Sequence, residues 1–389
     1  MIETKFKETE VGRVPADWEV KTISQMSDII TGATPSTSNP QYWDNGQILW
    51  MSSGELNNKF IHNVQGRITQ IGYDHTGTHM LPKHCVLIGL AGQGKTRGTA
   101  AYNKVELCTN QSIAAILPNE NTFNSLYLYY YTDSQYEQLR QLSAGDGGRG
   151  GLNKQILLNL YVSLPPLPEQ RRIATALSDI DSLISSLDEL IEKKRNIKQG
   201  TMQQLLTGKT RLKGFSEPWV EKKLGDICYE IFSGKNSMRS ESGKYPVYGS
   251  TGILGFSDVY LYDYQTILVA RVGANAGLVN KVSGKYDVSD NTLIIHLQHD
   301  QHINLLLYIL RYRKLNLLVF GSGQPLITGS QLKSLLIKLP ASLSEQRAIA
   351  SILTSMDDEI AALEQKREKY VSLKQGMMQE LLTGRIRLV

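Results

Sequence analysis

The chain has 389 residues, of which 42 are Lys or Arg and 37 are Asp or Glu, so its formal net charge is +5. This length predicts two or three domains, and the weak basic excess mildly favours a polyanionic partner. The three cysteines are far apart in the sequence, which argues against a disulfide framework or a zinc cluster and fits a reducing cytoplasm. The charged N-terminus does not resemble a signal peptide, and no apolar run reaches the roughly 20 residues that span a bilayer. We therefore expect a soluble, cytoplasmic protein.

Residues 1–163 form the first globular domain that the sequence predicts. Short β-branched and aromatic runs between Gly- and Asn-rich turns predict mainly strands, with a short helix within 123–140. In this domain "GLAGQGKT" (Gly89–Thr96) matches the phosphate-binding loop pattern G-x-x-x-x-G-K-[ST] and follows an apolar run typical of a strand. A P-loop NTPase is therefore one alternative function. It requires a helix directly after the loop, whereas the residues after Thr96 lean towards strand and lack helical spacing.

The same turn also suits recognition of nucleic acid. The corresponding segment of the second half, "TILVARVGANAGLVNKV" (Thr266–Val282), again predicts strand, glycine-rich turn and strand, but it has no Gly-Lys-Thr. The glycines therefore belong to the fold, and the amide, hydroxyl and cationic side chains beside them suit base edges and phosphates. The predicted DNA-binding residues are Gln93, Lys95, Thr96, Arg97, Tyr248, Arg271 and Asn275.

Residues 164–208 and 339–389 contain two copies of one long helix. The 40 residues from Glu169 align without a gap with those from Glu345, at an offset of 176, and 20 of the 40 positions are identical. Apolar residues recur at alternating steps of four and three, which is the pattern of a coiled coil. The predicted coiled-coil interface consists of Ile173, Leu177, Ile180, Ile184, Leu187, Ile191, Ile349, Leu353, Met356, Ile360 and Leu363.

Glycines mark both helix copies at matching places. Gly208 and Gly384 stand where a left-handed residue would end each helix. Gly200 and Gly376 lie inside the helices, where their recurrence suggests a close crossing of the two.

Residues 209–338 form the second globular domain, which is again mainly β with a short helix within 302–316. The predicted fold class is therefore α+β. Two mainly-β globular domains with short helices are joined by two long antiparallel coiled-coil helices, as a pseudo-twofold internal repeat.

The chain resembles the specificity subunit (HsdS) of type I restriction-modification systems over essentially its full length. The resemblance is carried by the helix ends "KQGTMQQLLTG" and "KQGMMQELLTG", by the lead-ins "LPPLPEQR" and "LPASLSEQR", and by "NPQYWDNGQILWMSSGEL" and "YPVYGSTGILGF". It implies that the globular domains are target recognition domains for the two halves of a split DNA sequence. It also implies that the helices dock two methyltransferase (HsdM) subunits, which restriction (HsdR) subunits join.

On this resemblance the chain itself is non-catalytic and binds no cofactor. AdoMet, ATP and Mg²⁺ are expected in the partner subunits, which carry adenine-N6 methyltransferase and ATP-dependent endonuclease activities. Because the two globular domains differ, we expect an asymmetric target with an unread spacer, whose length the helices set. Besides the P-loop NTPase, the remaining alternative is a coiled-coil interaction scaffold with no DNA role.

Overall fold

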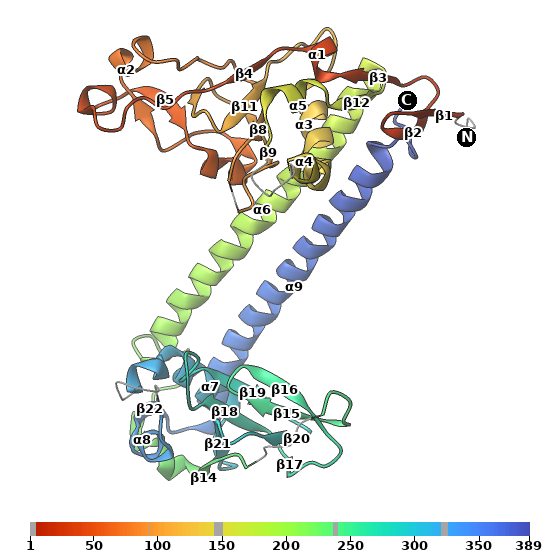
Figure 1. Cartoon of the computed structure of the whole chain (residues 1–389). Coiled ribbons are helices and arrows are strands. Elements are labelled where there is room, and N and C mark those ends of the chain that lie inside the picture. Colours follow the sequence, from red (N-terminus) through yellow and green to blue (C-terminus); the bar gives the residue numbers. More distant parts are fainter. Residues whose placement is uncertain (1–4, 93, 144–150, 236–239, 320–325) are drawn as a thin grey trace. The chain divides into compact units, whose positions relative to one another are not determined.

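The computed structural model describes residues 5–92, 94–143, 151–235, 240–319 and 326–389 (Figure 1). The chain divides into two compact units, unit 1 with residues 1–186 and 367–389 and unit 2 with residues 187–366. Two long helices, α6 (Leu167–Leu205) and α9 (Leu343–Leu381), each contribute to both units. The predicted domains 1–163, 164–208, 209–338 and 339–389 have their boundaries near the ends of the long helices. The boundaries between the two compact units lie instead inside these helices, after residues 186 and 366. Those four divisions stay a prediction.

Unit 1 is built on a five-stranded sheet with the strand order β4-β11-β8-β9-β6. Neighbouring strands are antiparallel, except that β6 runs parallel to β9. A three-stranded sheet (β10-β5-β7) and two two-stranded sheets (β1-β2 and β12-β3) complete its β structure. Its strands are β1 (Phe6–Thr9), β2 (Gly12–Pro15), β3 (Glu19–Thr22), β4 (Ile29–Thr31), β5 (Ile48–Met51), β6 (Phe60–Ile61), β7 (Arg67–Ile68), β8 (Val86–Gly89), β9 (Ala100–Asn103), β10 (Cys108–Thr109), β11 (Ile113–Ile116) and β12 (Tyr161–Leu164).

Short helices cover this β structure. They are α1 (Ile23–Met26), η1 (Pro40–Tyr42), η2 (Ser53–Asn58), α2 (Gln70–Asp74), α3 (Ser125–Ser134), α4 (Tyr136–Leu142) and α5 (Lys154–Leu158). α3 begins where the side chain of Asn124 accepts a hydrogen bond from the backbone N–H of Tyr127 at 3.0 Å, which caps the helix. The short helix predicted within 123–140 is thus confirmed, divided into α3 and α4 at Gln135.

Unit 2 repeats the central sheet with four strands in the order β14-β21-β18-β19. A second four-stranded sheet (β16-β15-β20-β17) and the pair β13-β22 accompany it. Its elements are β13 (Trp219–Lys223), η3 (Leu224–Ile227), β14 (Cys228–Ser233), β15 (Tyr245–Gly249), β16 (Gly252–Ser257), β17 (Tyr262–Asp263), β18 (Thr266–Ala270), β19 (Val279–Val282), β20 (Lys285–Val288), β21 (Thr292–Leu297), α7 (Ile303–Tyr312), η4 (Leu315–Leu318), α8 (Gly329–Ser334) and β22 (Leu336–Pro340).

The central sheets of the two units have the same plan. In unit 1, β11 pairs antiparallel with β4 and β8, and β8 pairs with β9; in unit 2, β21 pairs with β14 and β18, and β18 pairs with β19. The strands β8 and β18 are buried along their whole length, as their continuous apolar runs require. The duplication read from the helices therefore extends to the globular parts.

The long helices end as their glycines predict. Gly208 has φ +70° and Gly384 has φ +69°, so both occupy the left-handed conformation that follows a helix end. The close crossing inferred from Gly200 and Gly376 is wrong, because a Cβ added at either position would meet no atom within 4 Å.

Two further properties concern the described part of the chain as a whole. None of its helices is both long and apolar enough to cross a membrane. Its His, Cys, Asp and Glu side chains form no group of three that could hold a metal ion.

Candidate nucleic-acid interface

The glycine-rich turn of unit 1 joins two strands of the central sheet. The turn leaves β8 at Gly89 and enters β9 at Ala100, and the two strands pair antiparallel. A P-loop needs a helix directly after the turn, and here strand β9 follows it. The P-loop NTPase alternative is therefore wrong. Lys95 is exposed, and Thr96 and Arg97 are half-buried. Gln93 lies outside the described residues.

Helix α4 holds this turn in place. The hydroxyl of Tyr136 donates to the backbone carbonyl of Lys95 at 3.2 Å, and Nη1 of Arg140 donates to that of Gly94 at 2.8 Å. Gly98 has φ +81°, and a Cβ there would lie 3.3 Å from Leu139 of the same helix. The turn is therefore preformed against α4.

The turn of unit 2, between β18 and β19, has the same hydrogen bonds. The backbone N–H of Gly98 donates to Gly89 O, and that of Gly277 donates to Ala270 O, both at 2.9 Å. Gly277 also has a positive φ, of +92°. The two glycines therefore hold equivalent positions.

The other bonds of the turns fix which side chains correspond. Leu90 N–H donates to Ser112 O, as Arg271 N–H donates to Asn291 O. Arg271 is therefore the counterpart of buried Leu90, and not of a basic residue in the first turn.

A further pair of matched hydrogen bonds shows which residues correspond at the end of each turn, before β9 and β19. Thr99 N–H donates to Thr96 O, as Leu278 N–H donates to Asn275 O, so Asn275 is the counterpart of Thr96. Between these matched positions the second turn is shorter than the first, so that an alignment by glycines alone shifts the residues in between. Asn275 is exposed and Arg271 is half-buried.

Nε of Arg271 is buried and has no hydrogen-bond partner among the described residues. A buried donor of this kind is unfavourable unless something accepts from it. Tyr248 lies elsewhere, in β15 of the second four-stranded sheet, and its ring meets that of Tyr286 edge-on with centroids 6.0 Å apart. Among the described residues, the predicted DNA-binding positions other than Tyr248 lie in these two turns, and their contacts with DNA stay a prediction.

Sequence reasoning missed the residues that pack beside the turns. These are Tyr136 and Arg140 in unit 1, and Arg311, Lys314 and Asn316 in unit 2. They lie on or just after the short helices that the sequence did predict, but helical spacing alone does not say which end of a helix approaches a turn.

The short helix of each unit is tied to a long helix by a tyrosine and an ion pair. In unit 1, the hydroxyl of Tyr130 donates to Asp181 at 2.8 Å, and Nζ of Lys374 binds the same carboxylate at 2.6 Å and lies over the tyrosine ring. Burial raises the pKa of Tyr130, so its hydroxyl stays a donor. Residues of both long helices thus converge on one side chain of α3.

Unit 2 repeats this contact. The hydroxyl of Tyr308 donates to Asp357 at 2.7 Å, and Lys198 pairs with Asp357 and lies over the ring. Burial raises the pKa of Tyr308 to about 12. Asp181 and Asp357 stand at the helix repeat of 176 residues, as do Lys198 and Lys374.

The Glu-Gln pair that begins each helix copy is also used twice. Glu169 accepts two hydrogen bonds from Arg387, both at 2.8 Å, and Glu345 accepts two from Arg211, also at 2.8 Å. Arg387 additionally binds Asp17, and these hydrogen bonds lower the pKa of that carboxyl.

The following glutamine ties each helix to its globular part. Gln170 donates to Pro165 O and accepts from the backbone N–H of Asn124, and Gln346 likewise donates to Pro340 O and accepts from that of His302. The glutamine of the repeated "EQR" therefore joins each helix to the globular domain of its unit.

The predicted coiled-coil residues divide into two groups. Ile173 and Leu177 are buried in the main core of unit 1 with Leu381 and Leu382, and Ile349 and Leu353 are buried in the main core of unit 2. Met356 packs against the latter core. The other members lie outside these clusters: Leu187, Ile191 and Ile360 are buried, and Ile180, Ile184 and Leu363 are half-buried. Their role in a coiled coil stays a prediction.

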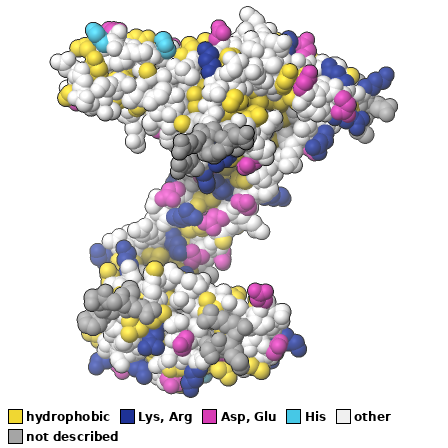
Figure 2. All heavy atoms as spheres, viewed as in Figure 1, with side chains coloured by type: hydrophobic (Ala, Val, Ile, Leu, Met, Phe, Trp, Pro, Cys, Tyr) yellow, Lys and Arg dark blue, Asp and Glu magenta, His cyan; other side chains and the backbone are white. Residues whose placement is uncertain are grey.

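Surface charge is mixed on the face drawn in Figure 2. Lys and Arg side chains lie interspersed with Asp and Glu along the long helices, and no continuous basic face is visible.

The family model described as the type I restriction modification DNA specificity domain matches residues 15–198 and again residues 216–372. The specificity subunit of the type I restriction enzyme MjaVIII of Methanocaldococcus jannaschii is 27% identical over 430 aligned residues, which cover 99% of this chain and 97% of that protein.

Two solved structures share the fold. The S subunit of a type I restriction-modification system from M. genitalium superposes with a TM-score of 0.67 at 17% identity, covering 97% of this chain and 98% of that one. A chain from a study of complex assembly and conformational transition of the type I restriction-modification system gives 0.56 at 18% identity, covering 96% and 99%.

The chain belongs to the family of type I restriction-modification DNA specificity subunits, because the two matches of the family model together cover most of its length. Its function is DNA target recognition, and it is a non-catalytic subunit.

Proposed function

We propose that the chain reads an asymmetric DNA sequence in two parts, one part with the β8–β9 turn and the other with the β18–β19 turn. The observation that carries this proposal is the pair of hydrogen-bond-matched turns with unlike side chains. Where the first turn has Leu90 and Thr96, the second has Arg271 and Asn275. Equivalent scaffolds with different side chains would read different half-sites.

The side chains of the second turn suit direct contact with base edges. Arginine pairs with O6 and N7 of guanine through two hydrogen bonds, and asparagine pairs with N6 and N7 of adenine. Arg271 is half-buried and Asn275 is exposed. In the first turn Lys95 is exposed and fits a phosphate or a guanine equally well.

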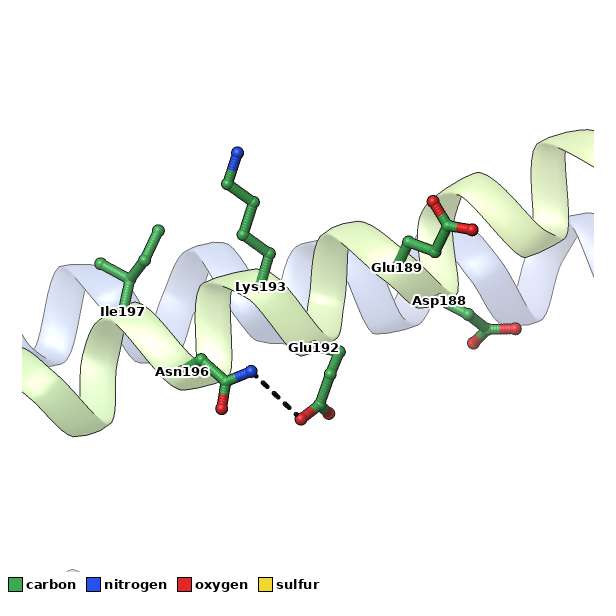
Figure 3. A pocket seen from close by; sticks show the side chains of 6 residues that line it. All are labelled: Asp188, Glu189, Glu192, Lys193, Asn196 and Ile197. Carbon is green, nitrogen blue, oxygen red and sulfur yellow. Dashed lines mark hydrogen bonds between the residues drawn. The ribbon is translucent and has the colours of Figure 1, made fainter.

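We further propose that the two long helices bind two methyltransferase subunits, through which restriction subunits join. Ile197 and Leu373 occupy the same place in the two helix copies, and both are large apolar side chains left about half exposed, at 46% and 48%. Lys193 projects from the same side of α6 as Ile197 (Figure 3), and Lys369 repeats it in α9. An exposed apolar position that recurs with its charged neighbour favours a partner present in two copies.

On this proposal the catalytic chemistry belongs to the partners. The methyltransferase subunits would bind AdoMet and methylate adenine N6, and the restriction subunits would use ATP and Mg²⁺. The chain would supply sequence recognition and the surface on which the partners assemble.

The test is to express this chain with its methyltransferase subunit in a host without other adenine methylation and to map the methylated adenines. We expect an asymmetric two-part motif. The double variant Arg271→Leu/Asn275→Thr, which gives the second turn the side chains of the first, should change the bases of one half only. A motif that changes in both halves, or in neither, would contradict the assignment of one half-site to each turn.

The scaffold without a DNA role predicts a different outcome. In that case the co-expressed complex would cause no gel shift with any duplex and no adenine would be methylated.

A further inference from the structure

An open recess of about 540 Å³ lies in unit 2 beside the β18–β19 turn. It is formed by that turn, by the start of β19 and by the residues that connect α7 to η4. α7 and β19 are in contact, as Figure 1 also shows for their labelled ribbons. The polar side chains that line the recess are Asn275, Asn280, Arg311, Lys314 and Asn316.

The recess is cationic. Arg311 and Lys314 are its charged residues, and none of the described residues that line it is Asp or Glu. A neighbouring groove in the same unit differs, since its cations Arg195 and Lys198 face Asp357 and Glu364. Uncompensated positive charge with three amide side chains is the chemistry of an anion site whose ligand also accepts hydrogen bonds.

The recess is preformed. Nε of Arg311 donates to the backbone carbonyl of Val279 at 3.2 Å, which holds the guanidinium against β19. Gly277 has φ +92°, and a Cβ there would lie 2.3 Å from the backbone N of Asn316. Only glycine allows the turn to approach the α7–η4 connection this closely, so little ordering is left for ligand binding.

Lys314 has a backbone conformation that favours glycine or asparagine. Its φ is +51° and its ψ is +67°, in the left-handed region, and its side chain is exposed. A side chain other than Gly, Asn or Asp in this region is strained by about 1–2 kcal/mol. Lys314 directly follows the C-cap of α7, where a left-handed residue commonly ends a helix, and its side chain lines the recess.

Unit 1 lacks the charge at the matching position. Because Tyr130 and Tyr308 make the same contact, Asp133 of α3 is the counterpart of Arg311 of α7. Asp133 is paired with Lys59 at 2.7 Å, so the charge at this position is compensated.

Unit 1 also has one cation beside its turn. Arg140, the counterpart of Asn316 beside the matched glycine, donates to Gly94 O, as Arg311 donates to Val279 O in unit 2. The two recognition domains therefore differ in charge where their turns meet the short helices.

We propose that this recess binds a phosphodiester group of the DNA backbone, with Arg311 and Lys314 as the cations and the asparagine amides as additional hydrogen-bond donors. This proposal rests on the proposed DNA recognition and adds to it: the second domain grips the backbone at a place where the first domain does not. The interaction fixes position and reads no base.

The test measures binding of the complex with its methyltransferase subunit to its mapped target over a range of salt concentrations. The variants are Arg311→Gln, Lys314→Gln and the double variant. Lys338→Gln, which removes an exposed cation from β22 of the same unit, is the matched control. Removing one cation that binds a phosphate should make the slope of log K against log salt shallower by about 0.9, with the methylated motif unchanged.

A second measurement identifies the ligand. Single neutral methylphosphonate groups are placed in turn along both strands of the target. In the wild-type complex we expect weaker binding at one or two phosphates beside one half-site, and in the double variant we expect no effect at those positions. Salt slopes equal to that of Lys338→Gln, or methylphosphonate effects that persist in the double variant, would overturn the proposal.

Two other outcomes have distinct meanings. Competition by inorganic phosphate at constant ionic strength that the double variant abolishes, without any methylphosphonate effect, would mean a site for free phosphate and would overturn the assignment to DNA. A wild-type complex that binds no duplex at all would instead overturn the proposed function itself.

Discussion

The ion pair between Glu169 and Arg387 allows a sharp test of how unit 1 is held together. Glu169 is only 2% exposed, and its carboxylate accepts two hydrogen bonds from the Arg387 guanidinium and one from the backbone N–H of Leu388. The variant Arg387→Met keeps an apolar stem but removes the charged guanidinium, which also lies over the Trp18 ring. It leaves a buried carboxylate with one backbone donor.

The expected destabilisation follows from this burial. Breaking a buried ion pair by removing one partner costs about 3–5 kcal/mol, because the remaining charge is uncompensated. For a cooperative unit of roughly 150–250 residues, each kcal/mol shifts the melting temperature by about 2–4 °C, so we expect a fall of about 6–20 °C. The double variant Glu169→Gln/Arg387→Met also removes the stranded charge and should recover at least about half of the stability.

The assay is thermal unfolding of the full chain at neutral pH, followed by circular dichroism. The control is Arg385→Met, two residues away, whose partner is Glu380 and whose side chain is 61% exposed. Exposed pairs contribute about 0–1 kcal/mol, so the control should shift the melting temperature by less than about 4 °C. A double variant no more stable than Arg387→Met would refute the reasoning, since the stranded charge would then not be the source of the destabilisation.

Three further outcomes are expected. In chemical denaturation, Gly277→Ala should lower the free energy of unfolding by more than the ~1–2 kcal/mol that a left-handed alanine alone costs. The reason is that its Cβ would lie 2.3 Å from the backbone N of Asn316. The control Gly284→Ala has φ +82° and no atom within 4 Å of its Cβ, so it should show only the ~1–2 kcal/mol cost. Because Arg387 lowers the pKa of Asp17, the Asp17 carboxylate stabilises the fold above the ordinary pKa of 3.8, and this contribution is lost as the pH falls below 3.8. The wild type should be more stable than Asp17→Asn by less than ~1 kcal/mol near pH 6 and equally stable near pH 2. A difference in stability that stays constant with pH would contradict this. Inserting seven residues into each long helix adds about 10 Å and should lengthen the unread spacer by about 3 base pairs at ~3.4 Å each, which methylation mapping would reveal; an unchanged motif would argue against the helices as a ruler.

The long helices were the part of the fold best predicted from the sequence, because the same pattern occurs in two copies that support each other. The terminal residues Gly208 and Gly384 adopt the predicted left-handed conformation, which glycine tolerates without a steric penalty. The internal Gly200 and Gly376 were misinterpreted, since they face open space and allow no close crossing. A missing side chain permits a close approach, but the sequence does not say whether another backbone uses the space.

For the turns, the sequence predicted the strand–turn–strand course but not which residues correspond. The two turns differ in length between the matched hydrogen bonds, and only these bonds show that Arg271 corresponds to Leu90. The charge of the recess beside the second turn was also out of reach, because it depends on which helix end approaches the turn. Three strands, β19, β20 and β21, lie between Asn275 and Arg311 in the sequence.

The division of the chain has a consequence for its synthesis. Unit 2 is one uninterrupted stretch, residues 187–366, whereas unit 1 needs residues 1–186 together with residues 367–389. During synthesis Glu169 is therefore made long before its partner Arg387, and all of unit 2 is translated between them. A chain that lacks residues 367–389 would contain all of unit 2 but only part of unit 1.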